Sequence, residues 1–444
     1  MKSVAKGARW ILQGRSGTAA TLQTVLARLL ILATNVATGV ITSRVLGPYG
    51  RGEYNAISLW PQFLAYLMTL GIPSALRYHL KRHPEQQSEI FSAAFLLSIV
   101  LGAVAMLIGI LFMPQFLHQY SAEVIRFARW FMIMAPVVLL SETFAAALEA
   151  REEFTFANQV RYLPPLMTLA LLSILALSNQ MTPFTTVLAY ALPSLPIFFW
   201  MLKYLWASFR PHWHGLTAAY RWLMSYGLRA GGIDLLGTLS ERVDQALVVG
   251  LLPPAAMGLY TLALSVSRML NLFHGSTTTV LLPKIAARPV EEVVAQTGKA
   301  VRVSTSVTIL AAIAVMLPVP FFMQLLYGSE FLAAVTVFRI LTVEVVLSGT
   351  VWVLAQAFLA LGRPGMLTFM QAISLGLTVP LMLLLIPIYG LEGAGLALLC
   401  STAIRLIFVL ICFPLILKVR PPSLILNRED WYFLQQMFRL RKAS

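Results

Sequence analysis

The chain has 444 residues, of which 58% are hydrophobic and 11% are charged, and its formal net charge is +15. Apolar residues at this share, spread over the whole length, cannot form one water-soluble core, so the composition indicates a membrane-embedded helical bundle. The basic excess does not indicate nucleic-acid binding, because it follows particular loops. The two cysteines, Cys400 and Cys412, lie in one apolar segment at a spacing that suits neither a disulfide nor a metal site.

The N-terminal segment, residues 1–19, is basic and has Trp10, Ile11 and Leu12 between its Lys and Arg residues. Its apolar run is too short for a secretory signal, so it predicts an amphipathic segment on the cytoplasmic surface of the bilayer. A second such helix is predicted over 427–440, where Asn427 is a plausible cap and a basic end follows an aromatic face.

Twelve mainly apolar segments reach the roughly twenty residues that a spanning helix needs. They are 22–45, 54–77, 90–113, 123–148, 154–177, 184–205, 222–251, 257–282, 301–326, 332–361, 366–388 and 393–417. The sequence therefore predicts an all-α polytopic membrane protein with about 12 transmembrane helices in two six-helix lobes. We assign 1–205 and 221–418 to the lobes, 206–220 to a cytoplasmic linker and 419–444 to a cytoplasmic tail.

Loop charge sets the predicted topology, since Lys and Arg accumulate in cytoplasmic loops. The even-numbered loops and the tail carry most of these residues, whereas the alternate loops 114–122, 178–183, 252–256, 327–331 and 389–392 contain none. The first external loop departs from the pattern, with Arg44 and Arg51. An even number of spans with both termini in the cytoplasm fits every other loop.

An internal repeat relates the two halves of the chain. A turn at 47–52 joins the first two spans, and the second span is broken at 71–73. A weaker copy of the turn lies at 247–262, with a constant offset between Pro48 and Pro254, Gly52 and Gly258, and Tyr54 and Tyr260. Two related halves joined head to tail are typical of transporters.

Charged residues inside predicted spans of the first half are mostly arginines. Arg28 and Arg161 lie roughly 10 Å from the cytoplasmic end, counting 1.5 Å per residue, and Arg129 lies a similar distance from the outer end. Each could extend its guanidinium to a lipid headgroup, but Asn35 continues a polar face from Arg28. We predict that these four residues bind substrate, and guanidinium groups suit a phosphate-bearing anion.

The second half carries both signs of charge. Asp234, Arg268, Glu344 and Arg405 lie near the middle of their spans, and Asp234, Glu241 and Asp244 share one helical face. These groups could be static pairs that hold the lobe together, or a proton or sodium site. We predict an ion-coupling role for the four acids and structural charge pairs for Arg268 and Arg405.

Four motifs together resemble the O-antigen and exopolysaccharide flippases of the polysaccharide-export family. They are SRVLGPYGRGEYNAISLW at 43–60, LGIPSAL at 70–76, DQALVVGLLPPAAMGLY at 244–260 and AFLALGRP at 357–364. The family belongs to the superfamily that also holds multidrug-and-toxin extruders and lipid II flippases. The resemblance covers nearly the whole chain. Each motif consists mainly of Gly, Pro and apolar residues, so the resemblance rests on the order and spacing of the motifs.

The resemblance implies two lobes facing a central cavity in a V-shaped molecule of the bacterial inner membrane. It implies that an undecaprenyl-diphosphate-linked glycan is flipped to the outer leaflet, with proton or sodium antiport as the energy source and no other cofactor. A cationic first-lobe cavity is known in the family, and Arg28 and Arg161 map onto it by depth and character. A monomer is expected, with polysaccharide assembly proteins as further partners.

Two other functions compete with this interpretation. A multidrug or organic-cation antiporter of the same superfamily favours an acidic, aromatic pocket, and Glu142 is the only acid well inside a first-lobe span. A membrane glycan polymerase or ligase needs a sizeable external loop, and the predicted outer loops are all short. His212 and His214 lack a third ligand, so a solvated loop is favoured over a metal site. No enzymatic activity is predicted.

Overall fold

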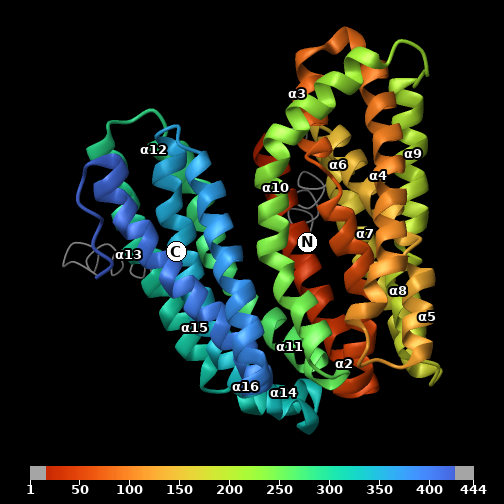
Figure 1. The fold of residues 1–444 in the computed structure, drawn as a ribbon, viewed down its shortest axis with the longest axis vertical. Coiled ribbons are helices and arrows are strands. Elements are labelled where there is room, and N and C mark those ends of the chain that lie inside the picture. Colours follow the sequence, from red (N-terminus) through yellow and green to blue (C-terminus); the bar gives the residue numbers. More distant parts are fainter. Residues whose placement is uncertain (1–16, 426–444) are drawn as a thin grey trace, which may run out of the picture. The chain divides into compact units, whose positions relative to one another are not determined.

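The computed structural model describes the backbone of residues 17–425, and the side chains of residues 30–425 except those at 154, 230, 231, 233 and 234. Within this range the regular elements are helices, and no strand is present (Figure 1). The predicted amphipathic segments 1–19 and 427–440 lie outside it, apart from residues 17–19, which begin α2. The side chains of Arg28 and Asp234 also lie outside the described residues.

Eight helices in this part of the chain are long and apolar enough to cross a membrane. Two of them, α2 (Gly17–Leu67) and α16 (Gly365–Cys412), contain a kink that separates two predicted spans. The kinks lie at Gly47 (φ +62°) and Gly390 (φ +58°), a left-handed conformation that glycine adopts without steric cost. In the structure, the predicted turn at 47–52 and the predicted loop at 389–392 are therefore each a helix kink at one glycine.

The predicted spans 222–251 and 257–282 are helical but are not among the eight. The first corresponds to α10 (Thr217–Leu251), and the second is divided between α11 (Pro254–Arg268) and α12 (Asn271–Ile285). Together with the eight long apolar helices, these three helices confirm the prediction of an all-α, multi-pass membrane protein.

The chain divides into two compact units. The first unit comprises the described residues up to Thr238 together with Pro253–Gly258, and the second comprises Leu239–Leu252 and the described residues from Leu259 onward. The first unit contains α2, most of α10, α3 (Ile72–Arg82), α4 (Gln87–Phe116), α5 (Ala122–Phe131), α6 (Met134–Ala150), α7 (Phe154–Leu177), α8 (Pro183–Ala191) and α9 (Ser194–Phe209). The start of α3 after Gly71 is the predicted break at 71–73.

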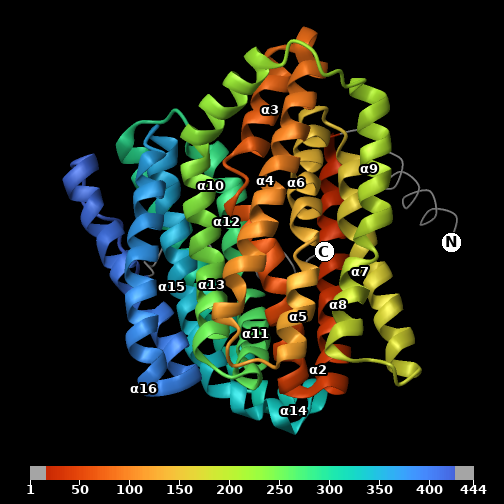
Figure 2. The same cartoon turned by 45° about the vertical axis from the view of Figure 1, so that its right-hand side comes forward.

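Helices α4 and α6 run side by side in the first unit, and α7 packs on α2 (Figures 1 and 2). The core beside α4 and α6 is aromatic: the rings of Phe91 in α4 and Phe209 in α9 stack at 4.7 Å, and Phe144 of α6 stacks on Phe91 at 6.2 Å. In lipid the neighbouring acyl chains are as apolar as these side chains, so such packing stabilises the unit through close van der Waals contact.

The second unit is built around α15 (Val335–Ala360). This helix contacts α12, α13 (Val290–Met316) and α16, and α14 (Val319–Tyr327) leads into it through a 3₁₀ turn at Ser329–Ala334. A short π-helix, Phe413–Leu417, follows α16 and places Phe413 against Phe358 of α15 at 5.1 Å. The residues around Trp352 of α15 are almost all buried.

The two copies of the repeated motif pack against each other inside the first unit. A Cβ added to Gly52 would lie 1.7 Å from the carbonyl oxygen of Pro254, and one added to Gly258 would lie 2.0 Å from that of Pro48. The glycine of each copy therefore lies against the proline carbonyl of the other copy. The sequence predicted the repeat, and the structure gives the reason for its glycines: two backbones meet without room for a side chain.

Arg51, which departs from the loop-charge pattern, is buried with 7% of its surface exposed. Its Nη1 donates hydrogen bonds to the carbonyl of Gly39 at 3.0 Å, to Thr42 Oγ1 at 3.4 Å and to Ser43 Oγ. These acceptors come from the end of the preceding helix. The Arg51 side chain therefore links the kink to the helix before it. This structural role explains the presence of an arginine in the predicted first external loop.

Candidate functional site

A cavity of about 690 Å³ lies inside the first unit, between α2, α6, α7 and α8. Its volume falls within the roughly 300–1,000 Å³ of small-molecule sites in proteins. Its polar lining consists of Asn35, Tyr54, Ser58, Gln62, Tyr66, Ser141, Glu142, Tyr190 and Ser194. Of the predicted substrate residues, Asn35 is one of the lining residues, and Arg129 and Arg161 are not.

Glu142 is the only acidic residue that lines this cavity among the described residues. Tyr66 donates a hydrogen bond from its hydroxyl to Glu142 Oε1 at 2.9 Å, and the rings of Tyr54 and Tyr190 stack at 5.0 Å. A carboxylate beside aromatic rings inside a bundle suits a proton or another cation. The sequence analysis noted this acid but did not assign it to the site.

A cluster of two arginines and one glutamate, which we call the Arg77–Glu149–Arg161 cluster, lies where α6 ends and α7 begins. Arg77 Nη1 lies 2.9 Å from Glu149 Oε2, and Arg161 Nη2 donates to Glu149 Oε1. The side chains of Arg77 and Arg161 are 45% and 51% exposed. One carboxylate shared by two guanidinium groups leaves a net positive charge that is accessible to an anion.

The cluster and the cavity both include residues of α6 and of α7. Glu142 and Glu149 are seven residues apart in α6, which places them on one face about 10 Å apart. Arg161 precedes the cavity prolines Pro164 and Pro165 by three and four residues in α7. Sequence reasoning missed Glu149, although its seven-residue spacing from Glu142 was available as a signal.

Other cations surround the cluster. Lys81 Nζ lies 2.8 Å from Glu152 Oε1, and this ammonium holds the pKa of the exposed Glu152 carboxyl below its ordinary value. Arg151 pairs with Glu153 at 2.8 Å, and its guanidinium lies 5.3 Å from the centre of the Phe209 ring. The end of α3 and the α6–α7 turn therefore form a predominantly basic surface.

Arg28 and Arg129 do not join this arrangement in the described structure. Arg28 occupies a position of α2 seven residues before Asn35, and its side chain is not described. Arg129 is exposed in the last turn of α5, next to Trp130, which is 77% exposed. The structure thus does not bring Arg129 together with Asn35 or Arg161.

In the second unit the predicted residues Asp244 and Arg268 lie together. Asp244 is 1% exposed and accepts a hydrogen bond at Oδ2 from the Tyr260 hydroxyl at 2.7 Å. Arg268 Nη2 lies 3.7 Å from the same oxygen and donates to the backbone carbonyl of Glu241 at 3.3 Å. The side chain of Glu241 is exposed, so these two acids of α10 lie in different environments.

Glu344 and Arg405 each contact a hydroxyl group. Thr402 Oγ1 donates to Glu344 Oε1 at 2.8 Å, and Arg405 Nη1 donates to Ser374 Oγ at 3.2 Å. In the part of the chain that the structure describes, no ion pair within 4.0 Å joins Glu344 to Arg405. Polar partners inside a span reduce the cost of burying a charge, and they hold both groups in fixed positions.

Among the residues whose side chains the structure describes, no group of three His, Cys, Asp or Glu side chains could hold a metal ion. His212 of the predicted linker 206–220 is exposed, and it also has two neighbours on α4. Its Nδ1 lies 3.0 Å from Ser88 Oγ and its Nε2 lies 3.5 Å from Glu89 Oε1, at the start of α4. The histidine therefore fixes the linker to the first unit.

Spanning helices, an internal cavity and charged groups inside the bundle define an all-α, multi-pass membrane protein of the transporter type. The fold agrees. It is similar to the lipid II flippase MurJ in an inward closed conformation, over 91% of this chain and 88% of that one, with TM-score 0.74 and 15% identity. It is also similar to an inward-facing MATE-family multidrug resistance transporter of the MOP superfamily, over 88% and 96%, with TM-score 0.71 and 14% identity.

A third similar structure is a MOP superfamily transporter from Pyrococcus furiosus with a binding pocket described as reversed in polarity (TM-score 0.60, 15% identity, 90% of this chain and 96% of that one). The chain belongs to the family described as Polysaccharide biosynthesis protein, whose profile matches residues 18–289. No curated protein sequence matches this chain. The predicted family is thereby confirmed, and the structural likenesses show the fold.

Proposed function

We propose that this protein flips a polyprenyl-diphosphate-linked oligosaccharide from the inner to the outer leaflet of the bacterial cytoplasmic membrane. It would do so by alternating access of two six-helix lobes, with twelve spans and both termini in the cytoplasm. Membership in a polysaccharide biosynthesis family and a fold shared with a lipid II flippase support this substrate class. The Arg77–Glu149–Arg161 cluster is the observation that carries the proposal.

This cluster has the chemistry that a diphosphate needs. Two guanidinium groups present forked donors, and only one carboxylate neutralises them, so an incoming diphosphate gains charge-assisted hydrogen bonds. The cluster lies on the basic surface that the loop-charge pattern assigns to the cytoplasm, where a lipid-linked precursor arrives. In this proposal Arg28 and Asn35 continue the route along α2, and Arg129 has no place in it.

Coupling to a proton or sodium ion would use carboxylates inside the bundle. Glu142 is the acid that faces a cavity, so we add it to the predicted set of Asp234, Glu241, Asp244 and Glu344. Asp244 already has Tyr260 and Arg268 as partners, which suits a structural role better. The side chain of Glu241 is exposed, so it has no buried environment that would hold a coupling ion.

The proposal is tested by complementation of a strain that lacks the gene, with surface polysaccharide and lipid-linked precursor as readouts. Arg77→Ala and Arg161→Ala should lower surface glycan and trap precursor at normal protein level. Arg151→Ala is the matched control, because Arg151 is an exposed, paired cation nearby that is not part of the cluster. Wild-type export by both cluster variants would contradict the proposed diphosphate route.

Organic-cation extrusion is a second candidate, because the first-unit cavity combines one carboxylate with Tyr54, Tyr66 and Tyr190. Glu142→Gln keeps an acceptor for the Tyr66 hydroxyl but removes the charge. If the protein extrudes cations, expression of the wild type should raise resistance to cationic dyes and the variant should not. Unchanged dye resistance on wild-type expression would eliminate this candidate and leave the flippase proposal standing.

A further inference from the structure

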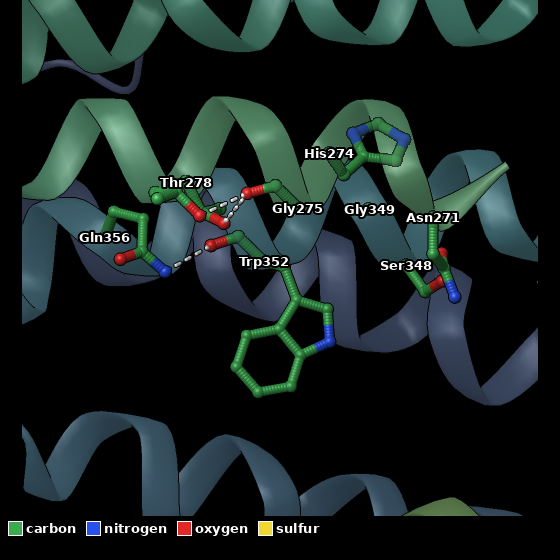
Figure 3. A pocket seen from close by; sticks show the side chains of 9 residues that line it. Asn271, His274, Gly275, Thr278, Ser348, Gly349, Trp352 and Gln356 are labelled. Atoms are coloured by element: carbon green, nitrogen blue, oxygen red, sulfur yellow. Dashed lines mark hydrogen bonds between the residues drawn. The ribbon is translucent and has the colours of Figure 1, made fainter. Parts of the chain in front are cut away.

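A second cavity, of about 440 Å³, lies within the second unit between α12 and α15. It is lined by Asn271, His274, Gly275, Thr278, Thr279, Ser348, Gly349, Trp352 and Gln356 (Figure 3). Among these described lining residues there is no Asp, Glu, Lys or Arg. Charge attraction therefore cannot select its ligand, and a neutral molecule that forms hydrogen bonds fits it best.

Trp352 supplies the aromatic surface of this cavity. From Gly349 to Phe358 every residue of α15 is buried except Trp352, which is 42% exposed. Figure 3 shows its indole ring projecting away from α12. Trp352 is therefore the exposed side chain in an otherwise buried stretch, and it is one of the residues that line the cavity. A flat indole face offers an apolar surface at low entropic cost.

The polar groups of the lining lie toward α12, on one side of this ring (Figure 3). Thr278 and Thr279 each donate a hydrogen bond to the Gly275 carbonyl, at 3.0 and 2.8 Å, and Gln356 Nε2 donates to the Trp352 carbonyl at 3.1 Å. In these bonds the threonine hydroxyls and the Gln356 amide group are donors. The threonine oxygens and the Gln356 carbonyl oxygen can therefore still accept hydrogen bonds from a ligand. Asn271 and Ser348 lie side by side at the other end of the cavity (Figure 3).

His274 is a buried polar residue in the lining of this cavity. Its side chain is 3% exposed, and neither ring nitrogen has a hydrogen-bond partner among the described residues. The imidazole lies directly against α15, because a Cβ at Gly349 would approach its Cδ2 to 1.8 Å. Buried polar groups in native proteins are nearly always hydrogen-bonded, so the unpaired imidazole points to a ligand or to ordered water.

We propose that this cavity binds a sugar ring of the transported glycan, with the indole of Trp352 against the apolar C–H face and the Asn, Gln and Thr side chains around the hydroxyl groups. A pyranose is neutral, apolar on its faces and rich in hydroxyl groups at its rim, and this matches the lining. The inference rests on the proposed flippase function. It assigns a neutral sugar of the substrate to the cavity of the second unit.

The test compares two probes on the purified full-length protein: the lipid-linked glycan extracted from the deletion strain, and polyprenyl diphosphate without sugar. Trp352→Ala should weaken binding of the glycan lipid by about tenfold or more, as for a buried aromatic anchor, and should leave the bare diphosphate unchanged. Thr278→Val should weaken the glycan lipid by a few-fold. Trp200→Ala is the matched control, because Trp200 is also 42% exposed and lies in α9 of the first unit.

The outcomes separate the inference from the function on which it rests. Unchanged binding of the glycan lipid by Trp352→Ala and Thr278→Val would overturn the sugar site and leave the flippase proposal intact. Failure of the wild type to bind the glycan lipid would overturn both. Binding of the bare diphosphate shows in each case that the variant is folded, and size-exclusion profiles provide a second check.

Discussion

The two units place their charged groups in opposite ways. In the first unit the cavity contains Glu142, and the exposed arginines of the Arg77–Glu149–Arg161 cluster lie about two helical turns away. In the second unit the acids Asp244 and Glu344 already hold protein partners, and the cavity lining has no charged side chain among its described residues. An ionisable residue inside a span therefore does not by itself mark a site. Glu142 also has a hydroxyl partner, Tyr66, and differs from these two acids because it lines one of the two cavities described above.

The contact between the repeated motifs should be the least tolerant position in the first unit. Gly52→Ala would place a methyl group 1.7 Å from a backbone oxygen that no side-chain rotation can move. We expect a loss of about 3 kcal/mol or more, seen as low yield and a lowered melting temperature in detergent. Gly376→Ala is the control in the second unit, because no atom lies within 4 Å of the added carbon. Equal stability of the two variants would contradict the reported packing.

The buried acid of the second unit should matter for stability. Asp244→Ala leaves the buried Tyr260 hydroxyl without its acceptor and Arg268 without its carboxylate, at a cost of about 1–3 kcal/mol. Glu241→Ala keeps the backbone carbonyl that Arg268 contacts and should change stability by less than about 0.5 kcal/mol. Melting curves of the two variants would test this, and a larger loss in Glu241→Ala would reverse the assignment.

The acid that faces the first cavity should matter for transport and little for stability. Glu142→Gln should reduce transport by about tenfold or more, because the charge is lost while the hydrogen bond to Tyr66 can persist. Glu344→Gln keeps an acceptor for Thr402 and should change transport much less. If Glu344→Gln abolishes transport and Glu142→Gln does not, ion coupling belongs to the second unit.

A smaller effect is expected from His79, which lies outside the predicted spans near the end of α3. Burial and the neighbouring His83 and Arg82 lower the pKa of His79 from its ordinary value of 6.5. The unfolded chain then takes up this proton first as the pH falls, so stability present above pH 6.5 is lost at lower pH.

The change should be roughly 1 kcal/mol or less. It would appear as a melting temperature that falls more between pH 7.5 and 5.5 in the wild type than in His79→Gln. The rings of His79 and His83 both stack on Trp222, so indole fluorescence reports the same step. A stronger pH dependence in the variant would contradict the sign.

The sequence predicted much of the fold because its signals are local. Apolar length locates the helices, and the glycine-containing stretches 47–52 and 389–392 locate breaks between spans without knowledge of their neighbours. The site depends on pairing between helices, which no local pattern encodes. Arg161 was predicted to bind substrate or to reach a lipid headgroup, and its partner Glu149 comes from another helix. The cavity around His274 and Trp352 was not predicted, for the same reason. Its lining residues come from α12 and α15, and no local pattern in the sequence shows that these two helices pack together.

The central claim is that a lipid diphosphate crosses the bilayer along the Arg77–Glu149–Arg161 cluster. The most direct measurement is flipping in proteoliposomes of a fluorescent polyprenyl-diphosphate glycan, followed with a membrane-impermeant quencher. Wild-type protein and Arg151→Ala should bring the inner-leaflet label to the quencher, and the Arg77→Ala, Arg161→Ala double variant should leave it protected. Flipping by the double variant at the wild-type rate, or no flipping by the wild type above protein-free vesicles, would contradict the account.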